Sequence, residues 1–287
     1  MLSRLRQQRV VASRPAQVNP QAAESGYPAD GRLRLLSFNI QVGISTERYR
    51  HYLTRGWQHL LPAAGRAGNL QRIGDLLSGY DLVALQEADG GSLRSGYVNQ
   101  VEHLAQLGAF PYWYQQLNRN LGRIAQHSNG LLSRLRPTLL EDHPLPGPPG
   151  RGAILMRFGE GDNALAVVMM HLALGPRTRT RQLAYIRELL QNYRHQVLMG
   201  DMNTHASDLL ETSPLRDLGL IAPQVQATFP SWRPQRCLDH ILLSPGLTLE
   251  RVSVLPEPIS DHLPVSVEIR LPDGCRQDSA LSLKDAR

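Results

Sequence analysis

The sequence predicts an α/β fold in which two mixed β-sheets pack face to face and helices cover their outer faces. Three observations lead to this fold class. Short β-type runs recur along the chain, helical periodicities lie between some of them, and the helices are too few for strict alternation of strand and helix. The composition, with 41% hydrophobic and 20% charged residues among 287, is that of a chain with a buried core and excludes disorder throughout.

The expected elements follow one another from residue 33 onward. Helical periodicity is clearest at 70–77 and at 180–193, where Leu183, Ile186, Leu189 and Leu190 share one face. The segments 43–68 and 108–128 are long polar connections, although Tyr112, Trp113 and Tyr114 have the character of a core strand. The expected strands are 33–40, 82–87, 130–135, 153–157, 164–171, 196–201, 238–243, 251–255 and 265–271, and the PLPGPPG turn at 144–150 links two hairpin-like strands.

These elements predict one domain at 32–271 between two flexible tails, a basic one at 1–31 and a polar one at 272–287. The longest apolar run is about half the roughly 20 residues that a spanning helix needs, and no secretory apolar region opens the chain, so we expect a cytoplasmic location. Cys237 and Cys275, the latter in the predicted tail, are too few for a disulfide framework. The net charge is +6 and only Lys284 among 31 basic residues is lysine, which favours anionic partners.

Polar side chains recur where the apolar runs begin or end, at the points where strands reach a sheet edge. Each alone is typical of a turn or a cap, but together they predict one cleft. Carboxylates, amides and imidazoles without a cysteine suit Mg²⁺ or Mn²⁺, and a phosphate ester is the natural substrate of such a site. The residues are Asn39, Glu87, His171, Asp201, Asn203, Asp239, Asp261 and His262.

The ordered motifs SFN, LQE, SNGLLSR, MMHL, GDMN, LDHILLS and ISDHLP resemble the endonuclease/exonuclease/phosphatase superfamily over residues 32–271. The resemblance implies a four-layer α/β sandwich and divalent-metal-dependent cleavage of a P–O bond. It implies that Glu87 is the main metal ligand, with Asn39 and Asp261 beside it. It further implies that Asp201 activates the attacking water next to Asn203, that Asp239 orients a site histidine, and that His171 and His262 contact the phosphate.

Three residues are candidates for substrate binding. They are Asn129 of the SNGLLSR motif, Arg181 near the start of the second helix, and Trp232 of the TFPSWRP run, which resembles bacterial members of unassigned substrate. Arg181 either contacts the substrate phosphate or lies in a solvated helix start. Trp232 either forms a base-stacking or headgroup platform or packs a structural loop. Segment 118–123 is a candidate substrate loop. We expect His240 to be a core imidazole with a satisfied hydrogen bond rather than a catalytic one.

Three functions remain open. The arginine excess favours a phosphodiesterase acting on DNA or RNA, although SFNIQVG departs from the SWN sequence of the abasic-site endonuclease branch. The alternative is a phospholipid or headgroup phosphodiesterase or phosphatase at an anionic membrane surface, against which no secretion signal or exposed apolar hairpin is evident. A non-catalytic phosphate-binding relative is disfavoured by the intact motifs. We expect a monomer without a protein partner.

Overall fold

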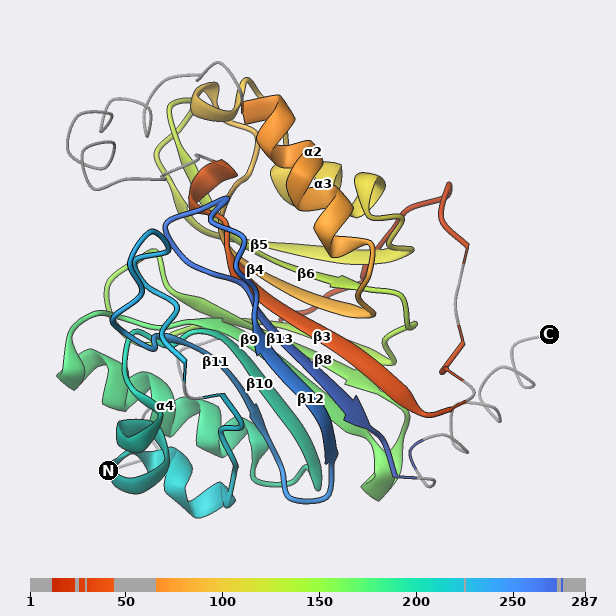
Figure 1. Cartoon of the computed structure of the whole chain (residues 1–287), viewed down its shortest axis with the longest axis vertical. Coiled ribbons are helices and arrows are strands. Elements are labelled where there is room, and N and C mark those ends of the chain that lie inside the picture. Colours follow the sequence, from red (N-terminus) through yellow and green to blue (C-terminus); the bar gives the residue numbers. More distant parts are fainter. Residues whose placement is uncertain are drawn as a thin grey trace.

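The computed structural model describes residues 12–23, 26–28, 30–43, 66–224, 226–272 and 275, so most of the connection at 43–68 and of the tail at 272–287 lies outside the described residues. Within them, two mixed sheets face each other and helices lie on both outer faces, which confirms the predicted fold class (Figure 1). No helix in the described part of the chain is long and apolar enough to cross a membrane.

The first sheet has seven strands and contains both ends of the predicted domain. Its two central strands run parallel, whereas the last strand of the chain pairs antiparallel with the first predicted one, Arg270 opposite Arg32. The order across the sheet is β12 (Thr248–Val254), β13 (Val265–Arg270), β3 (Arg32–Asn39), β4 (Leu82–Asp89), β6 (Gln126–Ser133), β5 (Tyr112–Asn120) and β2 (Gln17–Val18).

The second sheet has six strands. Here β9 and β10 run parallel and the other pairs run antiparallel. Its order is β1 (Ala12–Ser13), β7 (Leu139–Pro144), β8 (Gly152–Phe158), β9 (Leu165–His171), β10 (His195–Asp201) and β11 (Asp239–Leu243).

Alternation of side chains along the strands divides the apolar residues among three buried clusters. The cluster between the sheets contains Leu35 of β3 and Val167 of β9. A second packs α4 (Pro176–Leu190) on the six-stranded sheet, and a third packs α2 (Arg66–Leu77) and α3 (Gln100–Leu107) on the seven-stranded sheet. The shorter helical turns are η2 (Gln41–Gly43), η4 (Leu93–Ser95), η5 (Gly161–Asn163), η6 (Asp208–Thr212) and η7 (Pro214–Leu218).

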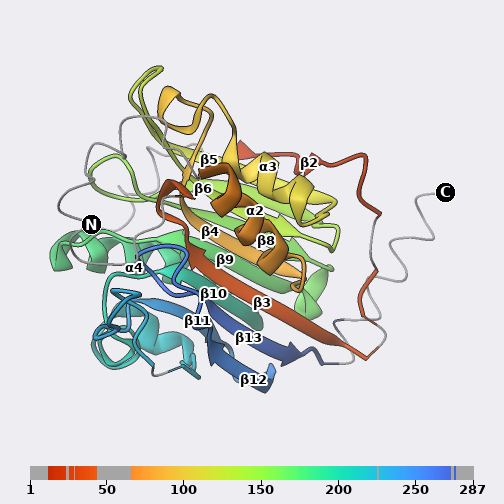
Figure 2. The same ribbon diagram turned by 45° about the horizontal axis from the view of Figure 1, so that its top comes forward.

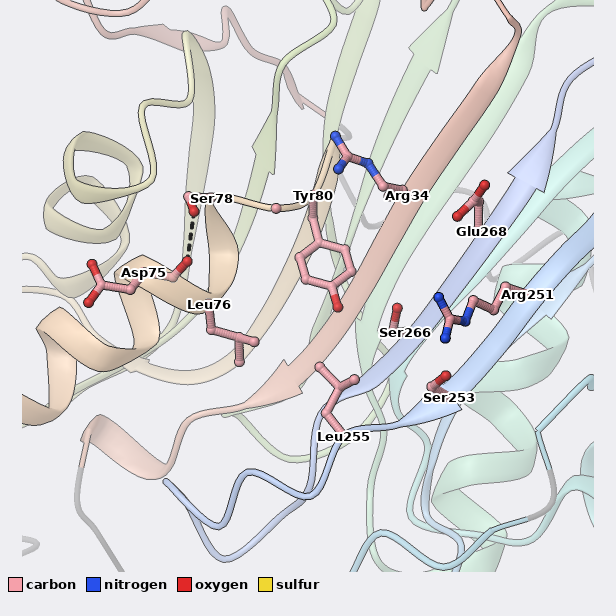
Figure 3. A pocket seen from close by; sticks show the side chains of 11 residues that line it. Arg34, Asp75, Leu76, Ser78, Tyr80, Arg251, Ser253, Leu255, Ser266 and Glu268 are labelled. Atoms are coloured by element: carbon pink, nitrogen blue, oxygen red, sulfur yellow. Dashed lines mark hydrogen bonds between the residues drawn. The ribbon is translucent and has the colours of Figure 1, made fainter.

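The helices leave part of the outer face of the seven-stranded sheet uncovered, and a pocket of about 510 Å³ lies there between the end of α2 and the strands β3, β12 and β13 (Figure 3). Arg34, Arg251, Asp75 and Glu268 bring two charges of each sign to its lining, next to the ring of Tyr80. None of the residues predicted for catalysis lines this pocket.

The N-terminal segment differs from the predicted tail. Residues 12–13 pair with β7 of one sheet and residues 17–18 pair with β5 of the other, so this short stretch of chain connects the two sheets. Asn19 is buried, and Ala16 and Tyr27 pack against the cluster between the sheets. The expectation of a flexible tail is therefore wrong for these residues, because backbone pairing with distant strand edges orders a segment that has no periodicity of its own.

Two further expectations are corrected. Cys275, assigned to the C-terminal tail, is buried in the cluster between the sheets. The predicted connection at 108–128 instead forms the hairpin of β5 and β6, in which Tyr112 and Tyr114 face the interior. That hairpin carries exposed apolar side chains, among them Leu117 and Ile124, contrary to the absence of an exposed apolar hairpin assumed from the sequence.

Candidate active site

The predicted polar residues meet at one edge of the sandwich, where the parallel strands of both sheets end. Asn39 ends β3 and Asp201 ends β10, and the Asn39 side-chain amide donates to Asp201 Oδ2 over 3.2 Å. This hydrogen bond joins the two sheets. His171 ends β9 directly opposite Asp201 in the β9–β10 register, so both side chains reach the same place.

Asp201 lies at the centre of these contacts. Its Oδ2 is 3.6 Å from His171 Nε2, and Oδ1 accepts a hydrogen bond of 3.0 Å from the backbone N–H of Asn203. The Asn203 side chain in turn donates to the carbonyl of Leu172 over 3.0 Å, which holds the segment after β10 against the end of β9. Glu87 approaches from the other sheet, with Oε1 at 3.9 Å from His171 Nε2.

A second group consists of His262, Asp239 and Thr228. His262 Nδ1 and Asp239 Oδ2 are 2.8 Å apart, and the Thr228 hydroxyl donates to the same carboxylate oxygen over 2.6 Å. The ring of Phe229 packs against the His262 imidazole with a centroid distance of 4.8 Å. The imidazole is therefore oriented by a buried carboxylate on one side and by an aromatic ring on another.

Asp261 is held by its neighbours. Ser260 donates its hydroxyl to Asp261 Oδ1 over 3.2 Å, and the carbonyl of Asp261 accepts from the backbone N–H of Ser231. The loop after Thr228 thus fixes the position of the Asp261–His262 pair. All of Asp239, Asp261 and His262 are buried.

The backbone is unusual at two of these positions. Glu87 has φ of 56° at the irregularity where the β4–β6 register shifts between Leu85 and Ala88, and Asn203 has φ of 52°. Left-handed backbone at a non-glycine residue is uncommon and often marks a functional site. The bulge redirects the Glu87 side chain, which is 37% exposed although its strand neighbours are buried.

One glycine permits the close approach of β9 and β10. Gly200 has φ of 145°, and a Cβ there would lie 1.8 Å from the carbonyl oxygen of Met170. No side chain fits in this space. Gly200 therefore allows the two strand ends, with His171 and Asp201, to come together.

Burial and like charge shift the carboxyl groups of the cluster toward protonation. Burial, with a contribution from Asp239, raises the pKa of Asp201 to about 7. Burial, reinforced by Glu87 and opposed by His262, raises the pKa of Asp261 to about 6. Several carboxyl groups crowded around one imidazole are typical of a site that receives a further cation.

The pKa values of His171 and His262 shift in opposite directions. Burial lowers the pKa of His171 well below its usual value, and Arg151, His262 and His127 lower it further. Burial alone would also lower the pKa of His262, but Asp239, Asp201 and Asp261 outweigh it and raise that pKa well above the usual value. The site therefore contains a neutral imidazole and a cationic one.

The residues present fit a divalent cation. Asp201 and Asp239 each offer a carboxylate oxygen, and these two atoms and a ring nitrogen of His262 lie within 4.8 Å of one another. Asp239 Oδ1 and His171 Nε2 are buried without a hydrogen-bond partner. Both atoms are therefore available to a bound ligand. This group differs from the set Asn39, Glu87 and Asp261 predicted as metal ligands, with which it shares the cleft.

The residues predicted to bind substrate have different surroundings. Asn129 is buried, and its side-chain N–H groups are directed to Gln116 and to the carbonyl of Gly152. Arg181 is exposed on α4 and makes no hydrogen bond or ion pair with the described cluster residues. Trp232 is half-buried in the loop bonded to Asp261, where Phe229 rather than Trp232 contacts His262. His240 is a buried imidazole bonded to the Thr204 carbonyl at 2.8 Å, as expected.

Sequence reasoning missed three residues of the site. Thr228 positions Asp239, and Arg151 lies close enough to His171 to lower its pKa. Burial and Arg94 lower the pKa of His127 of β6, and Glu87 opposes this shift. His127 directly precedes the SNGLLSR motif and Arg151 directly follows the PLPGPPG turn, so proximity to a motif was the available signal.

Comparisons with known proteins agree with this geometry. A model described as the Endonuclease/Exonuclease/phosphatase family matches residues 36–262. No curated protein sequence matches the chain. The chain is similar to an endonuclease/exonuclease/phosphatase from Beutenbergia cavernae, with 21% identity, 84% of this chain and 72% of that chain covered, and a TM-score of 0.63.

Two further solved structures share the fold at lower identity. TDP2 of D. rerio, complexed with a single-strand DNA product, is 16% identical over 84% of this chain and 100% of that chain, with a TM-score of 0.60. The mannosyl-6-phosphatase Bt3783 of Bacteroides thetaiotaomicron is 17% identical over 83% of this chain and 99% of that chain, with a TM-score of 0.57. At these identities the similarity is one of fold.

Proposed function

Because the chain belongs to the Endonuclease/Exonuclease/phosphatase family of phosphate-ester hydrolases, we propose that it cleaves a phosphodiester bond by in-line attack of an activated water, with Mg²⁺ or Mn²⁺ as cofactor. The single observation that carries this proposal is the meeting of Asn39, Glu87, His171, Asp201, Asp239 and His262 at one sheet edge, with two orphaned buried polar atoms among them.

Glu87, Asn39 and Asp261 are the proposed ligands of the cation, and Asp201 lies beside them, since its Oδ2 accepts a hydrogen bond of 3.2 Å from the Asn39 amide. When bound, a divalent cation would neutralise phosphoryl oxygens and favour an attacking hydroxide. Asp201 receives the proton of the attacking water, since burial gives its carboxyl group a pKa of about 7, close to the working pH.

The protonated His262 donates to a phosphoryl oxygen, and Asp239 holds the imidazole in this orientation through Nδ1. Negative charge moves toward the leaving oxygen as the bond breaks, so a cation fixed at this point stabilises the transition state more than the bound substrate. His171, kept neutral by burial, directs its unpaired Nε2 toward the space between Glu87 and Asp201.

Nucleic acid is the substrate class that the arginine-rich composition favours. TDP2, a fold neighbour, is described with a single-strand DNA product, and another neighbour is a mannosyl-6-phosphatase, so the shared fold accompanies both kinds of phosphate ester. A second candidate is a phospholipid diester, which the exposed apolar side chains beside the site favour.

Hydrolysis of bis-p-nitrophenyl phosphate with Mg²⁺, with Mn²⁺ and with EDTA tests the proposal. We expect metal-dependent turnover in the wild-type protein and a loss of several orders of magnitude in Glu87→Gln, which removes a charge and keeps the shape. Calorimetry should show weaker binding of either cation to this variant. Unchanged affinity would exclude Glu87 as a ligand, and metal-independent turnover would overturn the proposed chemistry. A parallel panel of DNA, RNA, abasic DNA and phospholipids assigns the substrate class.

A further inference from the structure

Exposed apolar side chains are concentrated beside the active site. Ten large hydrophobic residues are exposed in the described part of the chain, and six of them fall in two segments, 93–98 and 117–124. We name these six the rim patch: Leu93, Tyr97, Val98, Leu117, Leu121 and Ile124. Isolated exposed hydrophobic residues are ordinary, but a concentration of this kind on a globular domain marks an interaction surface.

The two segments of the rim patch lie against each other. The backbone N–H of Leu93 donates to the carbonyl of Arg123 over 2.7 Å, and that of Arg94 donates to the carbonyl of Ile124 over 3.4 Å. Further along the hairpin, the Asn99 side chain donates to Gln115 Oε1 over 3.0 Å. These bonds connect the turn after β4 to the β5–β6 hairpin, so the two segments that carry the rim patch lie side by side.

A buried ion pair holds this surface in place. Asp89 Oδ1 accepts from the backbone N–H groups of Gly91 and Ser92, and Asp89 Oδ2 pairs with the Arg94 guanidinium. Both charged side chains are almost fully buried. The rim patch is thus presented by a turn with a fixed conformation, which lowers the entropic cost of binding a partner.

The hairpin projects past the strand end that carries Glu87. β6 runs antiparallel to β4 with His127 opposite Asp89, so residues 118–125 extend beyond the end of β4 on the side of the active site. Figure 2 shows this hairpin, in yellow-green, protruding from the body next to the ends of β4, β5 and β6. A surface that the rim patch contacts would therefore face the mouth of the site.

Positive charge surrounds the apolar side chains. Arg119 and Arg123 are exposed in the same hairpin, and neither forms an ion pair within the residues that the structure describes. Arg151 lies nearby, because Gly150 donates its N–H to the carbonyl of Asn118. An apolar tip flanked by free guanidinium groups matches an apolar bilayer interior beneath anionic headgroups.

We propose that the rim patch docks the protein on an anionic lipid bilayer, with the active site opening toward the headgroups. Leu121 and Ile124 enter the interfacial region, while Arg119 and Arg123 pair with lipid phosphates. Five of the six side chains are aliphatic, so they offer no stacking platform for the bases of a nucleic acid. Docking requires no turnover and thus stands apart from the proposed hydrolysis.

Flotation of the full chain with vesicles in EDTA tests the proposal without catalysis. The vesicles are phosphatidylcholine alone, or phosphatidylcholine with about one third phosphatidylglycerol. We expect wild-type protein to bind the anionic vesicles and to lose most of this binding in high salt. Leu121→Asp combined with Ile124→Asp should weaken binding by about tenfold or more, since membrane affinity scales with the apolar area inserted.

The matched control combines Ile221→Asp with Leu249→Asp, two exposed hydrophobic residues outside the rim patch. The control should bind vesicles as the wild-type protein does, and circular dichroism and melting temperature should show that both double variants are folded. Absence of wild-type binding, or equal binding by the tip and control variants, would overturn the proposal. So would a tip variant that keeps vesicle binding and loses affinity for a labelled single-stranded oligonucleotide. Wild-type turnover of a soluble diester tests the hydrolysis separately.

Discussion

The imidazole of His262 combines two properties that rarely occur together, almost complete burial and a pKa raised well above its usual value. The cause is the carboxylate of Asp239 at 2.8 Å from Nδ1, which is itself held by Thr228. A fixed buried cation of this kind costs no reorganisation when charge develops on a substrate.

His262→Ala should therefore lower kcat by about a hundredfold or more and change KM little, on the scale of single electrostatic deletions in active sites. His240→Asn is the matched control, because His240 is equally buried but bonded to the Thr204 carbonyl. The control should have a lower melting temperature than the wild-type protein and the same turnover per folded molecule. Wild-type turnover in a stably folded His262→Ala protein would contradict the catalytic role.

Gly200 gives a second prediction at the scale of one residue. Gly200→Ala places a methyl group where the Met170 carbonyl lies at 1.8 Å, so we expect a loss of about 3 kcal/mol or more in the free energy of unfolding. Urea denaturation of the wild-type and Gly200→Ala proteins measures this difference in unfolding free energy. Gly68→Ala, in α2 with no atom within 4 Å of the added carbon, should keep or gain stability. Equal stability of both variants would show that β9 and β10 can separate at no cost.

At the scale of an element, the turn after β4 depends on Asp89. Burial would raise the pKa of this carboxyl group, but Arg94 and hydrogen bonds from Ser92 and Ser95 lower it from 3.8 to about 2. A carboxyl group with a lowered pKa in the folded state stabilises the protein above its unfolded pKa. That stability, about 2 kcal/mol at neutral pH, is lost as the pH falls from 3.8 toward 2.

Urea denaturation of wild-type and Asp89→Asn proteins over a pH series measures this contribution. The difference in unfolding free energy should be constant above about pH 5 and shrink as the carboxyl group of the wild-type protein becomes protonated. A difference that stays the same at acid pH would mean that Asp89 acts through shape and hydrogen bonding alone.

The N-terminal segment gives the second prediction at this scale. Deletion of residues 2–22 removes β1 and β2, together with the buried Asn19. We expect the free energy of unfolding to fall by about 2 kcal/mol, which lowers the melting temperature by roughly 4–8 °C. Deletion of residues 2–11 alone should leave the melting temperature unchanged. Scanning calorimetry on both truncations distinguishes them, and equal melting temperatures would show that the paired residues contribute nothing.

At the scale of the whole molecule, the sequence predicted the two-sheet architecture because nine apolar runs carry the strand pattern by themselves. It also predicted the convergence of Asn39, Glu87, His171 and Asp201, since polar residues at the ends of buried strands lie at a sheet edge. Pairing that depends on distant partners could not be predicted. β1 and β2 have two residues each and acquire their order from β7 and β5.

The surroundings of individual side chains could not be predicted from the sequence either. Leu117 is an apolar residue of β5, yet it is 46% exposed because its side chain lies on the strand face opposite the buried Tyr112 and Tyr114. Phe229 and Trp232 are both aromatic residues of one loop, and only the folded loop decides that Phe229 meets the His262 ring. Arg151 approaches His171 because Gly152 pairs opposite His171 in the β8–β9 register, a contact between distant positions that no local pattern encodes.

The pairing of β3 with β13 has a consequence for synthesis on the ribosome. Arg32 finds its partner Arg270 only after 238 further residues (270 minus 32) have been made, which at about 5–20 residues per second takes roughly 12 to 48 s. Throughout this interval the apolar strand RLRLLSFN has one unsatisfied edge in a nascent chain. Slower translation should therefore lengthen the time for which this strand edge is open to pairing with another chain.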